Sequence, residues 1–157
     1  MKTAETEELW RAYRAAHPDV GDDYDVVAFG DSAAQADELA ELVVAGTKRA
    51  TAGSAYSFEG DDAEPAPVLG GHVVLVDGAG RPRCVWRTTQ LDVKPLTEVD
   101  AAFAWDEGEG DRSLAYWLDA HRAYFTREAG RLGYPFDDAM PTVLERFTVV
   151  WPPELAD

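Results

Sequence analysis

The pair of residues with the clearest chemical potential is Lys48 and Thr51, three positions apart in the segment 46–52. A threonine hydroxyl becomes an effective nucleophile when a base removes its proton. A lysine can be that base if burial or a nearby cation lowers its pKa from about 10.4, and Arg49 is a candidate for that cation. The same residue types also fit an exposed lysine after a helix and a threonine that begins a strand.

Two further candidates, Glu107 and Glu109, stand in an acidic segment with two glycines, residues 106–111, ahead of a long helical pattern. A carboxylate there could pass a proton to a leaving amine. Arg112 and Ser113 follow directly and could hold a substrate. The competing interpretation is structural, because acidic groups complement the dipole of the next helix and Ser113 can cap its first turn.

A strand predicted over residues 83–91 carries Trp86 and Arg87. Arg87 could contact a phosphate or a base edge, and Trp86 could stack on a base. Because side chains alternate along a strand, these two residues line one cleft only if the strand bulges. We therefore expect Trp86 in the core and keep Arg87 as a ligand-binding candidate. His121 shares an apolar helical stripe, where a packed histidine is the commoner outcome.

Metal and cofactor binding find little support in the sequence. The chain has one cysteine, and its three histidines are far apart with no ligand spacing. The acidic segment lacks the periodic oxygen ligands of a calcium loop, and there is no glycine motif that cradles phosphate. We expect neither a metal nor another cofactor.

The charge of the chain limits its partners. The net charge is −16, with 6 basic and 6 acidic residues in positions 48–94 and a balance of −8 on each side of that segment. A strongly acidic protein repels polyanions, so a long DNA duplex is excluded as a partner. A nucleoside or a short single-stranded RNA remains compatible with the neutral middle segment.

Length and composition predict a small globular protein. The chain has 157 residues, of which 46% are hydrophobic, and it shows no signal peptide or apolar run long enough for a membrane span. Together with the single cysteine, these features favour a cytoplasmic location and give no indication of membrane association. They leave the oligomeric state open.

Hydrophobic periodicity predicts an α+β fold. Helical spacing indicates helices over 6–16, 33–45 and 113–132, with a helical turn over 97–104. Strands are expected over 72–76, 83–91 and 143–151, with a hairpin turn over 77–80 and a surface loop over 57–71. Residues 26–29 form a short apolar stretch, and 47–52 is typical of an exposed turn that enters a strand. A small β-barrel flanked by helices accommodates this order.

Three sequence segments in the same order resemble bacterial proteins of the ASCH domain family. The segments are 29–52, which contains Phe29-Gly30-Asp31-Ser32 and Lys48-Arg49-Ala50-Thr51, then 107–125 and finally 140–150. The resemblance covers residues 24–152, which divides the chain into an N-terminal helical extension, 1–23, and the domain proper. It implies a PUA-like barrel of about five or six strands with a ligand cleft beside it.

The resemblance also implies a set of possible functions. Some bacterial members are amidohydrolases that remove the acetyl group from N4-acetylcytidine, and in these a lysine, a threonine three residues later and a glutamate are taken as catalytic. Carried over, these residues are Lys48, Thr51 and either Glu107 or Glu109, of which Glu109 lies nearer the helix start. The family is also associated with RNA binding and with ribonuclease activity, so a non-catalytic RNA-binding module and a ribonuclease remain alternatives.

Overall fold

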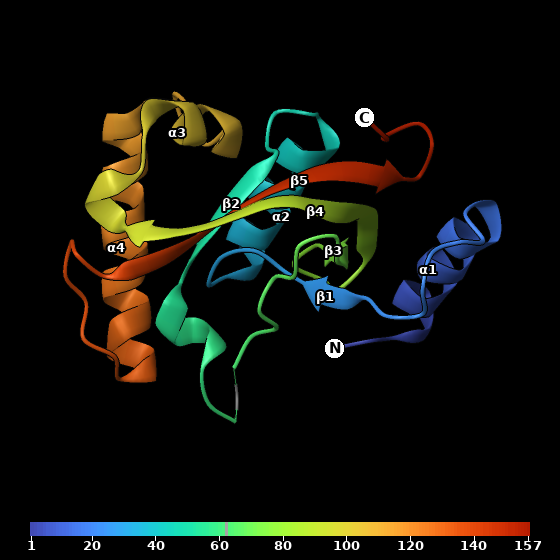
Figure 1. The fold of residues 1–157 in the computed structure, drawn as a ribbon, viewed down its shortest axis with the longest axis horizontal. Helices are drawn as coiled ribbons and strands as arrows, with labels where there is room; N and C mark the ends of the chain where they lie inside the picture. The colour runs from blue at the N-terminus through green and yellow to red at the C-terminus, as the bar shows by residue number, and fades with distance from the viewer. Residues whose placement is uncertain (62) are drawn as a thin grey trace.

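The computed structural model describes residues 1–61 and 63–157 as an α+β fold of four helices, two short 3₁₀ turns and one five-stranded sheet (Figure 1). The strands are β1 (Asp25–Val27), β2 (Ala50–Ser54), β3 (His72–Val76), β4 (Pro82–Pro95) and β5 (Pro141–Trp151). The helices are α1 (Ala4–Ala16), α2 (Ala33–Val44), α3 (Ala101–Glu107) and α4 (Leu114–Leu132), and the 3₁₀ turns are η1 (Ala55–Phe58) and η2 (Leu96–Glu98).

The sheet has the strand order β1-β3-β4-β5-β2 and curls into a half-barrel. β1 pairs with β3 in parallel, and the other three pairs are antiparallel. The two longest strands, β4 and β5, cross the molecule from the end covered by α3 and α4 to the end covered by α1 (Figure 1). Register shifts at Val85/Trp86 and Thr88/Gln90 bend β4. The predicted α+β, PUA-like architecture is confirmed.

Helix α4 forms because its apolar residues recur every three or four positions and its ends are capped. Ser113 accepts a hydrogen bond from the Tyr116 amide, and Gly133 takes the left-handed conformation at the C-terminal end. Its buried stripe packs with α3, β2 and the start of β5 around a core made of Ala50, Leu96, Val99, Phe103, Ala104, Trp117, Phe125, Met140 and Leu144. The stripe also contains two polar residues, His121 and Glu128.

The other two helices cover further parts of the sheet. α2 packs on a core that includes Phe29, Trp86 and Phe147, whose rings stack on one another. Trp86 is 1% exposed, which confirms its expected place in the core. α1 buries Trp10 and Tyr13 against β3 and β4. The division between an extension, 1–23, and the domain, 24–152, remains a prediction, and α1 packs on the same sheet.

Two element boundaries differ from the sequence prediction in ways that affect the site. α3 continues to Glu107, because Asp100 caps its start and Gly108 provides the left-handed residue at its end. Glu107 is therefore a helical residue, and the acidic segment predicted over 106–111 leaves the helix only at Gly108. The predicted loop 57–71 begins with the turn η1, and its residue 62 lies outside the described part of the chain. No described helix has both the length and the apolar character needed to cross a membrane.

Candidate functional site

A cavity of about 250 Å³ opens between the sheet, the segment after β1, α4 and the loop after η1. Lys48, Thr51, Glu107 and Glu109 all line it, so the structure brings the lysine, the threonine and both candidate glutamates together. This volume lies slightly below the range of about 300–1,000 Å³ that is usual for drug-sized ligands. The cavity is therefore suited to one small molecule.

Lys48 reaches this cavity because its backbone is fixed on both sides. The amide groups of Thr47 and Lys48 both donate to the carbonyl of Leu42 near the end of α2, and the Arg49 amide donates to Asp106 at the end of α3. The Lys48 side chain is 1% exposed, and its Nζ lies 3.4 Å from Glu107 Oε2 and 3.2 Å from Glu109 Oε2. Two of the three ammonium donors are thereby directed at carboxylates.

Gly108 controls how closely the two glutamates approach the lysine segment. Its φ of +72° is the left-handed conformation that glycine adopts readily. A Cβ at this position would lie 2.4 Å from the Thr47 carbonyl oxygen, closer than real contacts allow. Only glycine therefore lets the chain turn from Glu107 to Glu109 directly beside the backbone that carries Lys48.

The ionisation of these groups follows from their mutual contacts. Burial opposes a charge on Lys48, but Glu107 and Glu109 outweigh burial and raise the pKa of the amine. Burial likewise disfavours a charged Glu107, yet the positive charges of Lys48 and His121 hold the pKa of its carboxyl well below the usual range. Burial and the negative charge of Glu107 raise the pKa of Glu109 to about 7.

Lys48 is consequently an ammonium ion in this site. The condition under which Lys48 could act as a base, a pKa lowered by burial or by Arg49, is not met, because two carboxylates face its amine and the Arg49 guanidinium pairs with Asp157 at 2.8 Å. Of the three groups, Glu109 has the pKa best matched to taking up and releasing a proton near neutral pH.

His121 completes the cluster from α4. Its Nδ1 lies 2.8 Å from the Trp117 carbonyl oxygen, which can only accept, so Nδ1 carries a proton. Its Nε2 lies 3.4 Å from Glu107 Oε1. Burial lowers the pKa of this imidazole, but the facing Glu107 outweighs burial and the net shift is upward. We call Lys48, Glu107, Glu109 and His121 the Lys48 cluster.

Three members of the Lys48 cluster have donor atoms that could meet on one metal ion. One ligand atom each from Glu107, Glu109 and His121 lie within 4.8 Å of one another. The Lys48 ammonium already contacts both carboxylates and supplies the positive charge that a metal would bring. The arrangement is therefore self-compensated without an ion, and the absence of a metal remains our expectation.

Comparisons with known proteins place this geometry in a family. A model of the ASCH domain family matches residues 25–151. The chain belongs to the ASCH domain family. The ASCH domain of Lactobacillus crispatus JV V101 has a similar structure, with a TM-score of 0.84 and 30% identity over 96% of each chain. A protein from Enterococcus faecalis V583 matches with a TM-score of 0.81 and 31% identity, over 93% of this chain and 92% of that chain. No match is found among curated proteins.

In this ASCH domain, four predicted ligand-binding residues lie outside the cavity lining. Arg49 binds Asp157, and Arg112 stacks over Trp105 while donating to the carbonyl oxygen of that residue. Ser113 caps α4, as its structural interpretation expected. The fifth predicted residue, Glu107, lines the cavity. These placements favour structural work for Arg49, Arg112 and Ser113.

Arg87 takes a separate position. Its side chain is exposed and borders a second, shallower hollow with Tyr13, His72 and residues 19–23. Strand alternation accounts for this placement, because Trp86 and Thr88 point to the other face of β4 and are buried. Arg87 is therefore absent from the lining of the Lys48 cavity, although Gly71 and His72 border both hollows.

The cavity contains one functional candidate that the sequence reasoning did not single out, Glu145 on β5. This carboxyl is 6% exposed and lines the cavity directly opposite Thr51 in the β2–β5 pairing. A signal for it was available in the alternation of β5. Glu145 occupies the same phase as the core residues Phe147 and Val149, where a charged side chain is unusual.

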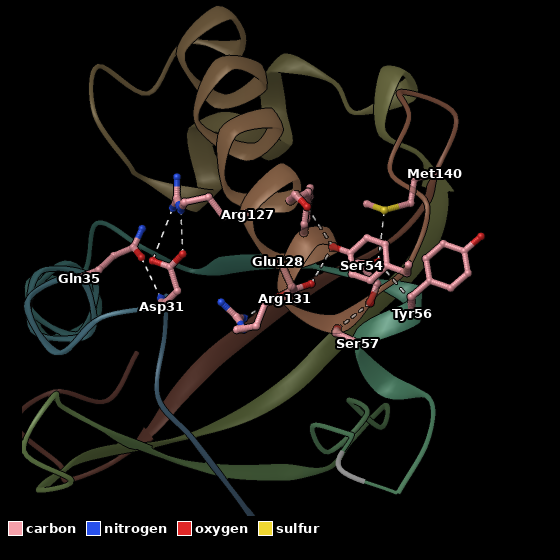
Figure 2. A network of polar contacts seen from close by, with 11 residues as sticks. Asp31, Gln35, Ser54, Tyr56, Ser57, Arg127, Glu128, Arg131 and Met140 are labelled. Carbon is pink, nitrogen blue, oxygen red and sulfur yellow. Dashed lines mark hydrogen bonds and ion pairs between the residues drawn. The ribbon is translucent and has the colours of Figure 1, made fainter.

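A second polar group borders the cavity two turns further along α4, about 10 Å from His121 by helix rise. Glu128 is 3% exposed, accepts a hydrogen bond from the Tyr134 hydroxyl at 2.9 Å, and lies 3.9 Å from Arg131. We call these three residues the Glu128 cluster. Figure 2 shows Glu128 and Arg131 near Ser54 and Ser57, with the exposed pair Asp31–Arg127 to one side.

Proposed function

We propose that this ASCH domain is an amidohydrolase that removes an acyl group from the base of a single nucleoside such as N4-acetylcytidine. The observation that carries the proposal is the convergence of Lys48, Thr51 and Glu109 in one cavity. A nucleophile, a cation and a carboxyl with a pKa of about 7 are the groups that acyl transfer requires.

Each residue has a role that follows from its ionisation. The Thr51 hydroxyl attacks the acyl carbon and forms an ester while the bond from that carbon to the base nitrogen breaks. Glu109 takes the hydroxyl proton and delivers it to the leaving amine. The third N–H of Lys48, which neither glutamate occupies, donates to the acyl oxygen as negative charge develops there. Water then cleaves the ester and restores Thr51.

The charge of the cavity supports a neutral ligand. Its described lining includes one lysine and no arginine, whereas six lining residues are acidic: Asp25, Glu64, Glu107, Glu109, Glu128 and Glu145. A phosphodiester would meet net repulsion there. An uncharged nucleoside avoids this repulsion, and so the cavity suits a free nucleoside better than a strand.

Short single-stranded RNA is the alternative ligand, bound without chemistry or cleaved at a phosphate. The ASCH fold makes an RNA partner a reasonable alternative, and exposed Arg87 outside the cavity is the one predicted phosphate-binding residue still available for it. In that case binding should fall with salt and with Arg87→Ala, because phosphate contacts release counterions.

A turnover assay separates these alternatives. Purified protein is incubated with N4-acetylcytidine and, separately, with a labelled single-stranded RNA, and products are resolved by chromatography. We expect cytidine and acetate from the nucleoside, and Thr51→Val should lower the rate at least about 100-fold. Thr89→Val, at an exposed position on β4, is the matched control and should retain full activity. Cleavage of the RNA with an intact nucleoside would refute the proposal.

A further inference from the structure

Glu145 occupies an unusual place for a carboxyl group. It lies in the middle of β5, paired with Thr51 on β2 and with Leu91 on β4. Residues directly opposite on neighbouring antiparallel strands project from the same face, with Cβ atoms about 4.5–5.5 Å apart. The carboxyl therefore stands beside the threonine hydroxyl inside the cavity.

The hydrogen bonds of Glu145 leave one of its oxygens available. Trp86 Nε1 donates to Oε1 at 3.1 Å, and Thr88 Oγ1 donates to the same oxygen at 2.6 Å. Among the described residues, none donates a hydrogen bond to Oε2, and none forms an ion pair with this carboxyl. Two donors on β4 thus fix the orientation of the group, while its second oxygen has no protein partner.

Structural need does not account for such an arrangement. Burying a carboxyl without a counterion is unfavourable, and burial indeed raises the pKa of Glu145, against the opposing effects of Thr88, Trp86 and Lys48. A glutamine would serve as acceptor for Trp86 and Thr88 equally well and would bring no charge into the core. The carboxyl is therefore better explained by what its free oxygen can contact.

We infer that Glu145 Oε2 accepts a hydrogen bond from an N–H group on the ligand's base, and so selects bases of the cytosine type over those of the uracil type. The inference rests on the proposed nucleoside ligand and adds its specificity. The exocyclic nitrogen of cytosine carries hydrogen, whereas uracil presents a carbonyl oxygen at the same position. A carboxylate oxygen attracts the first group and repels the second.

The position opposite Thr51 gives this contact a second consequence. An acyl carbon that the Thr51 hydroxyl attacks is bonded to the exocyclic nitrogen of the base. An N–H on that nitrogen then lies within reach of the neighbouring carboxyl. Glu145 would thus hold the amide that is to be cleaved, and it acts as a ligand-binding residue with no part in proton transfer.

Glu145→Gln provides a test that reverses the polarity of the contact. In this variant the amide oxygen keeps accepting from Trp86 and Thr88, so the NH₂ group replaces Oε2 at the cavity. Binding of cytidine and of uridine is measured by calorimetry at pH 8 on the wild type and the variant. We expect the wild type to prefer cytidine by roughly tenfold or more, and the variant to lose that preference or to favour uridine.

Two controls separate this effect from changes in charge or folding. Glu64→Gln removes one negative charge from another residue of the cavity lining and should leave the ratio of the two affinities unchanged. Thermal unfolding of Glu145→Gln should show no loss of stability, because both hydrogen bonds to Oε1 persist.

The outcomes distinguish this inference from the proposed function. A wild type that turns over N4-acetylcytidine, with an unchanged cytidine-to-uridine ratio in Glu145→Gln, would overturn the inference alone. Nucleoside binding whose preference reverses in the variant, without any turnover, would support the inference and remove the hydrolase. If the wild type binds neither nucleoside at millimolar concentration and does not turn over N4-acetylcytidine, both are wrong.

Discussion

Helix α4 contributes to two polar clusters beside the same cavity, and they solve the problem of buried charge differently. In the Lys48 cluster, charged groups compensate one another, and Glu107 Oε1 has no well-aligned hydrogen bond although His121 Nε2 is 3.4 Å away. In the Glu128 cluster, the carboxylate accepts a hydrogen bond from the neutral Tyr134 hydroxyl at 2.9 Å, and the Arg131 guanidinium, whose side chain is 50% exposed, lies 3.9 Å away. In the first cluster, charged groups in a cavity shift one another's pKa values, as functional sites often do. In the second, burial raises the pKa of the Tyr134 hydroxyl that donates to Glu128, which fits a structural role.

Replacing Lys48 should cause the largest loss of stability, because it leaves the buried carboxylate of Glu107 without its positively charged partner. Lys48→Met keeps the length of the side chain and removes its charge. We expect a loss of about 3–5 kcal/mol in the free energy of unfolding at pH 7. Urea denaturation measures this loss, and Lys94→Met, at an exposed position on β4, should change stability by less than about 0.5 kcal/mol.

The loss in Lys48→Met should shrink as the pH falls. Glu107 has a lowered pKa in the folded protein, so its stabilising contribution is present above its ordinary pKa and disappears on acidification. A loss that is as large at pH 3, below the ordinary pKa of 4.5, as at pH 7 would mean that Lys48 stabilises the fold by packing and that the two clusters stabilise the fold in the same way.

Glu109→Gln should change the free energy of unfolding by less than Lys48→Met does. The contribution of Glu109 to stability should also depend on pH in the opposite sense to that of Glu107. Because folding raises the pKa of Glu109 from 4.5 to about 7, the folded state favours its protonated form. The corresponding stability is present below about pH 4.5 and is lost as the pH rises to 7. The variant should therefore gain stability relative to the wild type between pH 5 and pH 8, while its hydrolase activity falls.

Urea denaturation of both proteins at several pH values provides this comparison. Parallel stability curves would show that the carboxyl titrates alike in the folded and unfolded chain. The Lys48 cluster would then lack the proton carrier that the proposed reaction assigns to it.

Of the three variants, Tyr134→Phe should change stability and activity the least. It removes the hydroxyl that donates to Glu128 and should lower the free energy of unfolding by about 1–2 kcal/mol. The rate constant for hydrolysis should be unchanged, since the Glu128 cluster takes no part in the reaction. Tyr116→Phe at an exposed position on α4 is the control. A large fall in turnover with normal stability would move part of the active site to this end of the cavity.

The α+β class could be predicted from the sequence because its local signals agree with one another, and the PUA-like architecture followed from the family resemblance. Apolar periodicity in α4, capping at Ser113 and the glycine at position 133 all indicate the same helix. The bend of β4 was not predictable, because a register shift depends on how neighbouring strands pair. Pairing is a long-range property that local alternation does not record.

The sequence and the family resemblance pointed to Lys48, Thr51 and the two glutamates that line the cavity, but not to Glu145 or to the ionisation of the group. Lys48 and Glu109 are 61 positions apart, and the family resemblance placed them together before any distance was known. The protonation of Lys48 depends on two carboxylates from another helix and loop, so its own segment could not indicate that its pKa is raised. Arg49 and Arg112 looked equally suited to ligands, but three-dimensional partners engage both.

Gly108 ties the chemistry of this site to a backbone constraint. Its missing side chain allows the segments around Thr47 and Glu109 to touch, and that contact sets the spacing of the charges. The pKa of Glu109 thus depends on how closely the two backbone segments approach each other. A methyl group at position 108 would push the segments apart and change that pKa without contacting any ionisable atom. Attempts to transplant the Lys48 cluster into another scaffold must therefore carry the glycine along with the charged residues.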